Sequence, residues 1–253
     1  QWRVPDHLKE RQDGIHGRID SLRFESDSIR GSRILEVYLP AGYDGSEGRY
    51  PVVYVHASRR PWTLGRVDVS LDNIIGKRVR PVIVVFVPSL VGGGYTEYVG
   101  SKRDAYSRIF VDEVVPFVDR TYRTVASREG RANMGTIYGA FMAFYATFAH
   151  PDIFGKLAIQ TMAWDQAAKA EHEALIVPVS SQRPLRIYLD WGKYDLRSPL
   201  EGNDLGRESE SFAQLLKARG YSFVGGRVND GAGWASWRNR TDQVFEALFP
   251  ISD

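Results

Sequence analysis

Short apolar runs alternate with amphipathic segments along most of the chain. Residues 50–57 and 79–88 are nearly continuous apolar runs, and their β-branched content, shortness and flanking Gly or Pro favour buried strands. We expect further strands at residues 131–134, 154–160, 185–190 and 221–228. Strands that are apolar on both faces are typical of a mostly parallel sheet with helices on both sides.

Helical spacing of apolar residues connects these strands. It predicts helices at residues 67–77, 104–122, 138–150, 203–219 and 235–249. Within the second of these, Asp104 is the expected N-cap and Pro116 predicts a kink. Gly220 follows the fourth and suits the C′ position of a helix.

The N-terminal part follows a different pattern. Residues 1–14 are polar and are expected to form an arm or a short helix. The alternating segments 18–26 and 32–39 flank a short turn and predict an antiparallel hairpin. No linker, repeat or low-complexity tract follows, so the sequence predicts a single α/β domain over residues 1–253.

Composition narrows the possible partners and cofactors. The 33 basic and 31 acidic residues leave a net charge of +2, so we expect no nucleic-acid or membrane partner. The absence of cysteine excludes disulfides, thiolate metal sites and a cysteine nucleophile. No His/Asp cluster has metal-ligand spacing, so neither a metal nor another cofactor is expected. No apolar run reaches the roughly 18 residues of a membrane span, which favours a soluble protein.

One strand–helix junction has the frame of a catalytic turn. Residues 135–139 are Gly-Thr-Ile-Tyr-Gly, which matches the nucleophile elbow G-x-S-x-G except that Ile137 replaces the serine. Gly135 and Gly139 permit a tight turn, and Ala140 permits close approach of strand and helix. An ordinary turn with two glycines would give the same pattern. Isoleucine has no hydroxyl group and cannot act as a nucleophile.

Longer stretches connect this turn to a known family. They are residues 110–124 before the elbow strand, residues 131–155 with the elbow and its helix, and residues 189–195 with 230–240. In these stretches the chain resembles the esterase D-like branch of the α/β-hydrolases, which includes S-formylglutathione hydrolases, enterochelin, feruloyl and acetylxylan esterases and mycolyltransferases. The resemblance implies an α/β-hydrolase fold and, for the family, serine carboxylesterase activity. Several relatives are secreted, so it also implies a secreted or periplasmic location.

The resemblance assigns three positions to a catalytic triad. The nucleophile position falls on Ile137, the acid position on Asp195 and the histidine position on Ala232. No histidine follows His172, so another register does not supply one. The implied triad is degenerate: it keeps its acid and lacks the two groups that perform covalent and proton-transfer chemistry.

The implied oxyanion hole uses backbone groups rather than side chains. Its donors would be the N–H of Tyr138 and an N–H near Ala57 and Ser58. Backbone donors survive side-chain replacement, so the cleft is expected to bind a carbonyl oxygen or an anion. Thr136, Ser58 and Tyr138 are the alternative nucleophiles, and Ser58 has no obvious base other than His56.

Three further side chains are candidates for the wall of the cleft. His56 ends a predicted strand beside the oxyanion loop, although a histidine at a strand end also serves structural roles. Trp164 follows the strand at residues 154–160, and Trp234 lies in the predicted histidine loop. Aromatic faces suit sugar rings and aryl acids, and they also pack in protein cores.

These observations lead to a pseudo-esterase hypothesis. The chain would keep a cleft for a small-molecule ester or a carbohydrate, without the serine and histidine of the covalent mechanism. A carboxylic-ester hydrolase with a non-standard mechanism is the alternative. A carbohydrate-binding module descended from a polysaccharide esterase is a third interpretation.

Overall fold

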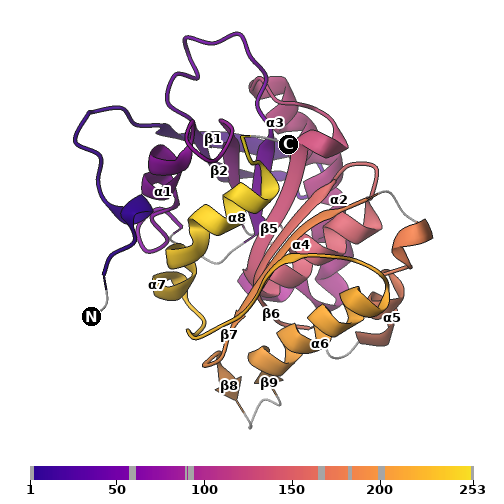
Figure 1. Ribbon diagram of the computed structural model, residues 1–253. Coiled ribbons are helices and arrows are strands. Elements are labelled where there is room, and N and C mark those ends of the chain that lie inside the picture. The colour runs from indigo at the N-terminus through magenta and orange to yellow at the C-terminus, as the bar shows by residue number, and fades with distance from the viewer. Residues whose placement is uncertain are drawn as a thin grey trace.

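An eight-stranded sheet forms the centre of the computed structural model, with helices on both faces (Figure 1). The structure describes residues 3–56, 61–88, 90, 94–164, 169–181, 184–198 and 203–251. The strand order is β1-β2-β4-β3-β5-β6-β7-β10. The bounds of these strands are β1 (Arg18–Ser26), β2 (Gly31–Leu39), β3 (Val52–His56), β4 (Ile83–Val87), β5 (Arg131–Ile137), β6 (Lys156–Met162), β7 (Arg186–Gly192) and β10 (Val224–Val228).

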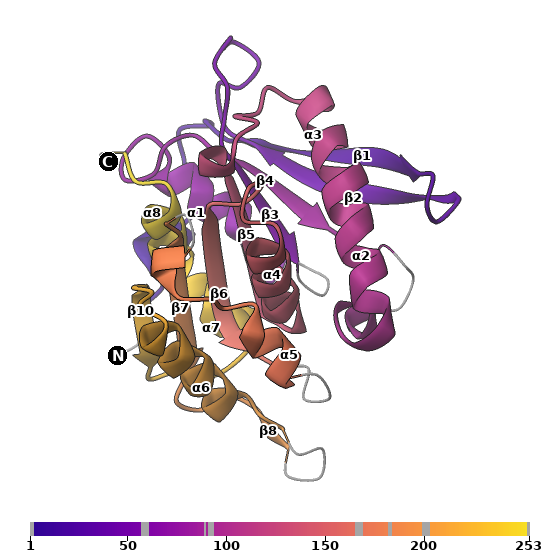
Figure 2. The ribbon, with the colours of Figure 1, turned by 90° about the vertical axis from the view of Figure 1, so that its right-hand side faces the viewer.

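The predicted mostly parallel sheet with an antiparallel N-terminal hairpin is confirmed. β1 and β2 pair antiparallel from Arg18↔Leu39 to Ser26↔Gly31, and β2 also runs antiparallel to β4. All other neighbours in the large sheet are parallel. Figure 2 shows the hairpin extending beyond the helical layers. A separate small ribbon joins β8 (Arg197–Ser198) to β9 (Asn203–Asp204).

Helices cover the two faces in layers that follow the alternation of the strands. In β3, Val53 and Val55 face the cluster formed with α1 and α8, whereas Val52 and Tyr54 face the cluster formed with α2, α3 and α4. No helix of the described residues is both long and apolar enough to cross a membrane. The helix bounds are α1 (Val67–Ile74), α2 (Arg103–Ile109), α3 (Val115–Thr121), α4 (Tyr138–Ala149), α5 (Lys169–Ala174), α6 (Leu205–Ala218), α7 (Trp234–Trp237) and α8 (Thr241–Leu248).

The predicted helix at residues 104–122 is divided into three parts. α2 and α3 flank a π-helical turn, Phe110–Val114, which ends two residues before Pro116. Proline has no N–H to donate within a regular helix, so a break in the α pattern at this point is expected. The N-cap prediction for Asp104 is wrong. α2 begins at Arg103, and Asp104 instead accepts hydrogen bonds from Arg103 and Tyr145, each at 2.9 Å. Gly220 follows Arg219, the C-cap residue of α6, and has φ +86°, as predicted for a C′ glycine.

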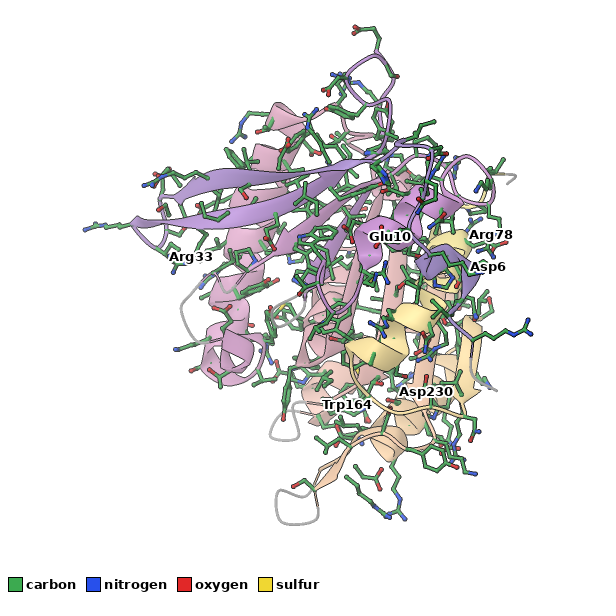
Figure 3. The ribbon with its side chains drawn as sticks, turned by 90° about the vertical axis from the view of Figure 1, so that its left-hand side faces the viewer. Asp6, Glu10, Arg33, Arg78, Trp164 and Asp230 are labelled. Carbon is green, nitrogen blue, oxygen red and sulfur yellow. The ribbon has the colours of Figure 1, made fainter. Side chains whose placement is uncertain are left out.

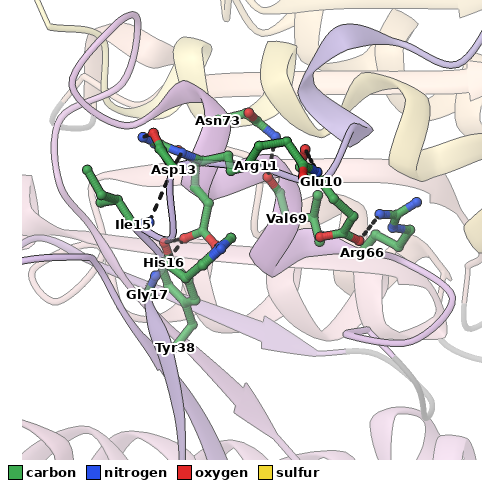
Figure 4. A network of polar contacts seen from close by, with 12 residues as sticks. Glu10, Arg11, Asp13, Ile15, His16, Gly17, Tyr38, Arg66, Val69 and Asn73 are labelled. Atoms are coloured by element: carbon green, nitrogen blue, oxygen red, sulfur yellow. Dashed lines mark hydrogen bonds and ion pairs between the residues drawn. The ribbon is translucent and has the colours of Figure 1, made fainter.

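The N-terminal arm is attached to α1 through a network of polar contacts (Figure 4), in which Asp72 makes several of the hydrogen bonds. The arm contains only one turn of 3₁₀ helix in its described part, Asp6–Leu8. The Asp72 carboxylate accepts hydrogen bonds from the Gly17 N–H at 2.8 Å and the Tyr38 hydroxyl at 2.8 Å. Arg11 donates to the Asp72 carbonyl at 2.6 Å. Asp72 on α1 therefore holds the arm through its backbone carbonyl and the hairpin through its carboxylate.

We predict that Asp72→Ala lowers the free energy of unfolding by about 2 kcal/mol, because it leaves the Gly17 N–H and the Tyr38 hydroxyl without their acceptor. Urea denaturation measures the change. Asp44→Ala is the control, since the Asp44 side chain is 72% exposed. Equal effects of the two substitutions would contradict this role of Asp72.

Candidate functional site

The carboxyl ends of six parallel strands meet at one edge of the sheet. Ligands of open α/β sheets bind at this edge. Figure 1 shows that it carries α7 and the β8–β9 ribbon, and Figure 3 places Trp164 and Asp230 at this end. The last residues of the six strands are His56, Val87, Ile137, Met162, Gly192 and Val228.

Ile137 forms the apex of a sharp turn between β5 and α4. Its backbone has φ +54° and ψ −117°, a conformation that β-branched residues rarely adopt. Such a residue stores about 1–3 kcal/mol of strain and is found mainly at functional sites. The geometry of an elbow is therefore present although the residue at its apex is an isoleucine.

Gly135 makes this turn possible. A Cβ atom on Gly135 would lie 2.1 Å from the carbonyl oxygen of Gly139 and 2.5 Å from the amide nitrogen of Ala140. No side chain fits in that space, because the atoms it would meet belong to the backbone. The close approach of β5 to α4 that the sequence predicts is therefore a backbone contact.

Thr161 connects the elbow to the acid loop, and sequence analysis did not identify it. The pairing of β5 with β6 shifts from Thr136↔Gln160 to Ile137↔Met162, so Thr161 is an extra residue with φ +65°. Its hydroxyl donates to Asp195 Oδ2 at 2.9 Å and accepts from Trp237 Nε1 at 3.3 Å. The bulge depends on pairing between strands, so no local sequence signal reveals it.

Asp195 lies in the turn after β7, at the edge where the elbow lies. Its Oδ2 also accepts the N–H of Gly192 at 3.0 Å, and its Oδ1 is buried without a hydrogen-bond partner in the described part of the chain. Burial raises the pKa of this carboxyl, while the hydrogen bonds from Gly192 and Thr161 oppose that rise. Oδ2 of Asp195 thus accepts two hydrogen bonds, whereas Oδ1 has no donor among the described residues.

The loop that contains Ala232 packs against the acid loop. The N–H of Tyr194 donates to the carbonyl of Asp230 at 2.9 Å, and the N–H of Lys193 donates to the carbonyl of Val228 at 2.8 Å. Ala232 is half-buried in this loop. The structure therefore brings the Ile137 turn, Asp195 and the Ala232 loop to one edge of the sheet.

A buried ionic network supports these loops from within. Asp190 on β7 is fully buried and pairs with Arg240 at 2.8 Å, and Arg240 also reaches Asp230 at 3.1 Å. Arg240 further donates to the carbonyl of Ser236 at 3.3 Å. Removal of one partner from a buried pair leaves an uncompensated charge, so this network strongly constrains the loop at residues 230–236. Sequence analysis did not single out Asp190 or Arg240.

His56 is enclosed rather than exposed to the cleft. It is fully buried, with Nδ1 2.8 Å from the Tyr106 hydroxyl and Nε2 3.4 Å from Asn133 Oδ1. The Asn133 amide donates to Thr147, so its oxygen faces His56, and Nε2 carries the hydrogen. Burial lowers the pKa of His56 to about 4. Both ring nitrogens are therefore engaged within the core.

The remaining predicted wall and oxyanion residues differ in their placement. Tyr138 is the first residue of α4, whose N-terminus faces the site edge. Trp234 is half-buried and contacts Trp237 edge-on, with ring centroids 5.7 Å apart. Ala57 and Ser58 lie outside the described residues.

Trp164 packs in the core at this end of the sheet. It is 2% exposed and contacts the rings of Phe144 and Phe212, each with a centroid distance of 5.6 Å. This placement does not support the predicted role as the wall of an open cleft.

Among the described residues, no group of three or more His, Asp or Glu side chains is arranged to hold a metal ion.

The comparisons with known proteins agree with this geometry. The family model described as "Putative esterase" matches residues 26–248, and the chain therefore belongs to this esterase family. An endo-1,4-beta-xylanase/feruloyl esterase of Xylanibacter ruminicola is 26% identical over 258 residues, which cover 96% of this chain. The match covers 33% of that relative, so the chain spans about a third of its length.

Solved structures of esterases share the fold. A feruloyl esterase module from Clostridium thermocellum complexed with sinapinate has a TM-score of 0.75 at 20% identity, over 98% of this chain and 93% of that one. The enterobactin esterase of Shigella flexneri has a TM-score of 0.69 at 16% identity, over 91% of this chain and 59% of that one. At these identities the likeness shows the α/β-hydrolase fold.

We predict that Gly135→Ala lowers the free energy of unfolding by about 3 kcal/mol, because the new methyl group would overlap the backbone of Gly139. Thermal or urea denaturation measures this loss. Gly31→Ala is the matched control, since its Cβ would meet nothing closer than 3.7 Å and should change stability by less than about 1 kcal/mol. A Gly135→Ala protein as stable as the control would contradict the tight elbow.

A second prediction concerns pH. The pKa of His56 is about 4 in the folded protein and about 6.5 when unfolded. Between these values the unfolded chain binds more protons, so stability falls as the pH is lowered from about 6.5 to about 4, by up to about 3 kcal/mol. Urea denaturation across this range should show a shallower pH dependence for His56→Gln than for the native protein. Parallel curves would show that His56 is not a buried neutral histidine.

Proposed function

We propose that this protein is a pseudo-esterase: it binds a small-molecule ester or carbohydrate at the elbow edge and does not hydrolyse it through an acyl-enzyme. The backbone of Ile137 carries this proposal. It has the strained geometry of a nucleophile elbow, φ +54° and ψ −117°, at a residue without a nucleophilic atom.

The surroundings of Asp195 support the same proposal. In a triad, the acid accepts a hydrogen bond from the histidine and orients it. Here Asp195 Oδ1 has no donor in the described residues, and the neighbouring loop carries Ala232. Without a histidine to orient, Asp195 cannot perform the role that the acid has in a triad.

An aryl ester is the favoured ligand class. The Clostridium thermocellum feruloyl esterase module is complexed with sinapinate, and a similar ferulic acid esterase of Anaeromyces mucronatus is in complex with ferulic acid. In this chain Trp234 is half-buried beside the loop of Ala232, so its ring can offer an apolar surface near the site edge. The helix N-terminus at Tyr138 would favour the carbonyl oxygen of such a ligand.

An ester hydrolase with a non-standard mechanism is the second candidate, and membership of the esterase family favours it. Its obvious base, His56, is poorly suited. Nδ1 faces the Tyr106 hydroxyl, Nε2 faces Asn133, and burial lowers its pKa to about 4. This candidate therefore requires a base other than a histidine at the end of β3.

We predict that the native protein binds methyl ferulate without hydrolysing it, and that Ile137→Ser combined with Ala232→His gains measurable hydrolysis. The two substitutions supply a hydroxyl nucleophile and a base beside Asp195. Calorimetric titration measures binding, and release of ferulate measures turnover. Ile137→Ser alone is the matched control and should remain without turnover above background.

Two results would contradict the proposal. Turnover by the native protein that is abolished in Thr136→Ala or Ser58→Ala would identify a working nucleophile and favour the second candidate. Failure of methyl ferulate and of xylan-derived oligosaccharides to bind would show that the cleft does not take these ligands.

A further inference from the structure

We propose that β1 is the contact strand of a symmetric homodimer, in which two copies of this chain pair antiparallel along their β1 strands. β1 is the last strand on one lateral margin of the large sheet, and its only partner among the described strands is β2. Figure 2 shows the tip of the hairpin beyond the helices. A second copy would continue the eight-stranded sheet across the seam between the two β1 strands.

The outward side of β1 presents backbone groups that the chain itself does not pair. Every second residue of an antiparallel strand directs its N–H and C=O to one neighbour, and β2 takes one of these two sets along Arg18–Ser26. The other set makes no backbone hydrogen bond with another part of the described chain. A nine-residue marginal strand of this kind is a template for a further strand.

The charges of β1 favour one register of self-pairing. Opposed residues of an antiparallel pair point to the same face, so a two-fold pair of identical strands is centred on one residue. When that residue is Phe24, Arg23 of each copy lies opposite Glu25 of the other. Centring the pair on Arg23 or on Asp20 places like charges opposite each other, and the two positions between them bring no unlike charges together.

One other register also opposes unlike charges, but the strands overlap less in it. Centring the pair on Ile19 brings Arg18 opposite Asp20. Because β1 begins at Arg18, the two strands would then overlap only from Arg18 to Asp20. Centring on Phe24 pairs residues 22–26 of both copies, so more backbone hydrogen bonds form.

The side chains at the seam are available for these contacts. Arg23 and Glu25 are 69% and 63% exposed and form an ion pair along their own strand, which the second copy would extend to four alternating charges. On the other face, Leu22 and Phe117 are half-buried, and the Phe117 ring lies 5.3 Å from that of Phe24. The second copy would cover the exposed part of these apolar side chains. Exposed ion pairs contribute little affinity, so we expect the backbone to hold the dimer and the charges to set its register.

Sedimentation velocity of the whole chain tests the proposal. We expect a monomer–dimer equilibrium with a Kd of about 100 µM, as for a small interface. Arg23→Glu and Glu25→Arg each place like charges opposite each other twice, so each should weaken association at least about tenfold. The double variant Arg23→Glu/Glu25→Arg restores unlike charges across the seam and should recover the dimer.

Arg227→Glu is the matched control. It makes the same charge reversal at an exposed residue of β10, the strand on the other lateral margin of the sheet. Association of this variant should equal that of the native chain. Thermal denaturation shows whether each variant is folded, and the exposure of Arg23 and Glu25 leads us to expect that it is.

Three results would overturn the proposal. A native chain that stays monomeric up to about 1 mM would show that β1 does not pair with itself. A double variant that remains as weak as the single variants would show that Arg23 and Glu25 do not face each other across the seam. Equal weakening by Arg227→Glu would place the contact away from β1 or assign it to non-specific charge effects.

Discussion

The backbone contact between Gly135 and Gly139 is the constraint on which the carboxyl edge depends. β5 and α4 approach so closely that a Cβ on Gly135 would lie 2.1 Å from the Gly139 carbonyl. The chain can reverse within this space only if the apex residue adopts a positive φ, which Ile137 does at +54°. The position of α4, and with it the edge at which ligands of such sheets bind, follows from this turn.

The strain at Ile137 is matched by a second strained residue on the neighbouring strand. Thr161 has φ +65°, and its hydroxyl is held between Trp237 and Asp195. Strained backbone persists only where the surroundings over-determine it. Here the hydrogen bonds of Thr161 and the buried pair of Asp190 with Arg240 provide that restraint. These contacts restrain the backbone at the carboxyl edge of the sheet, and a restrained backbone suits the binding role that we propose for this edge.

The two edges of the sheet differ in chemistry. The elbow edge presents a carboxylate, Asp195, beside an apolar apex, whereas the opposite edge gathers Arg128, Lys156 and Arg186 around a cavity. They are separated by the length of the strands, and the layer between them holds buried polar side chains such as Asn133, Gln160 and Asp190 as well as apolar ones.

The sequence by itself determined the elements and their order, because apolar runs and helical spacing are local properties. It located the β1–β2 hairpin, the buried strands, Gly220 after α6 and the glycines of the elbow. It failed where distant segments decide the outcome. Asp104 was expected to cap a helix, but α2 begins one residue earlier, and the contact of Asp104 with Tyr145 depends on packing against α4. Thr161 contacts Asp195 only because of a bulge between two strands. One cavity is lined by residues that are far apart in the chain, Arg128, Lys156 and Arg186, because parallel strands begin at the same edge.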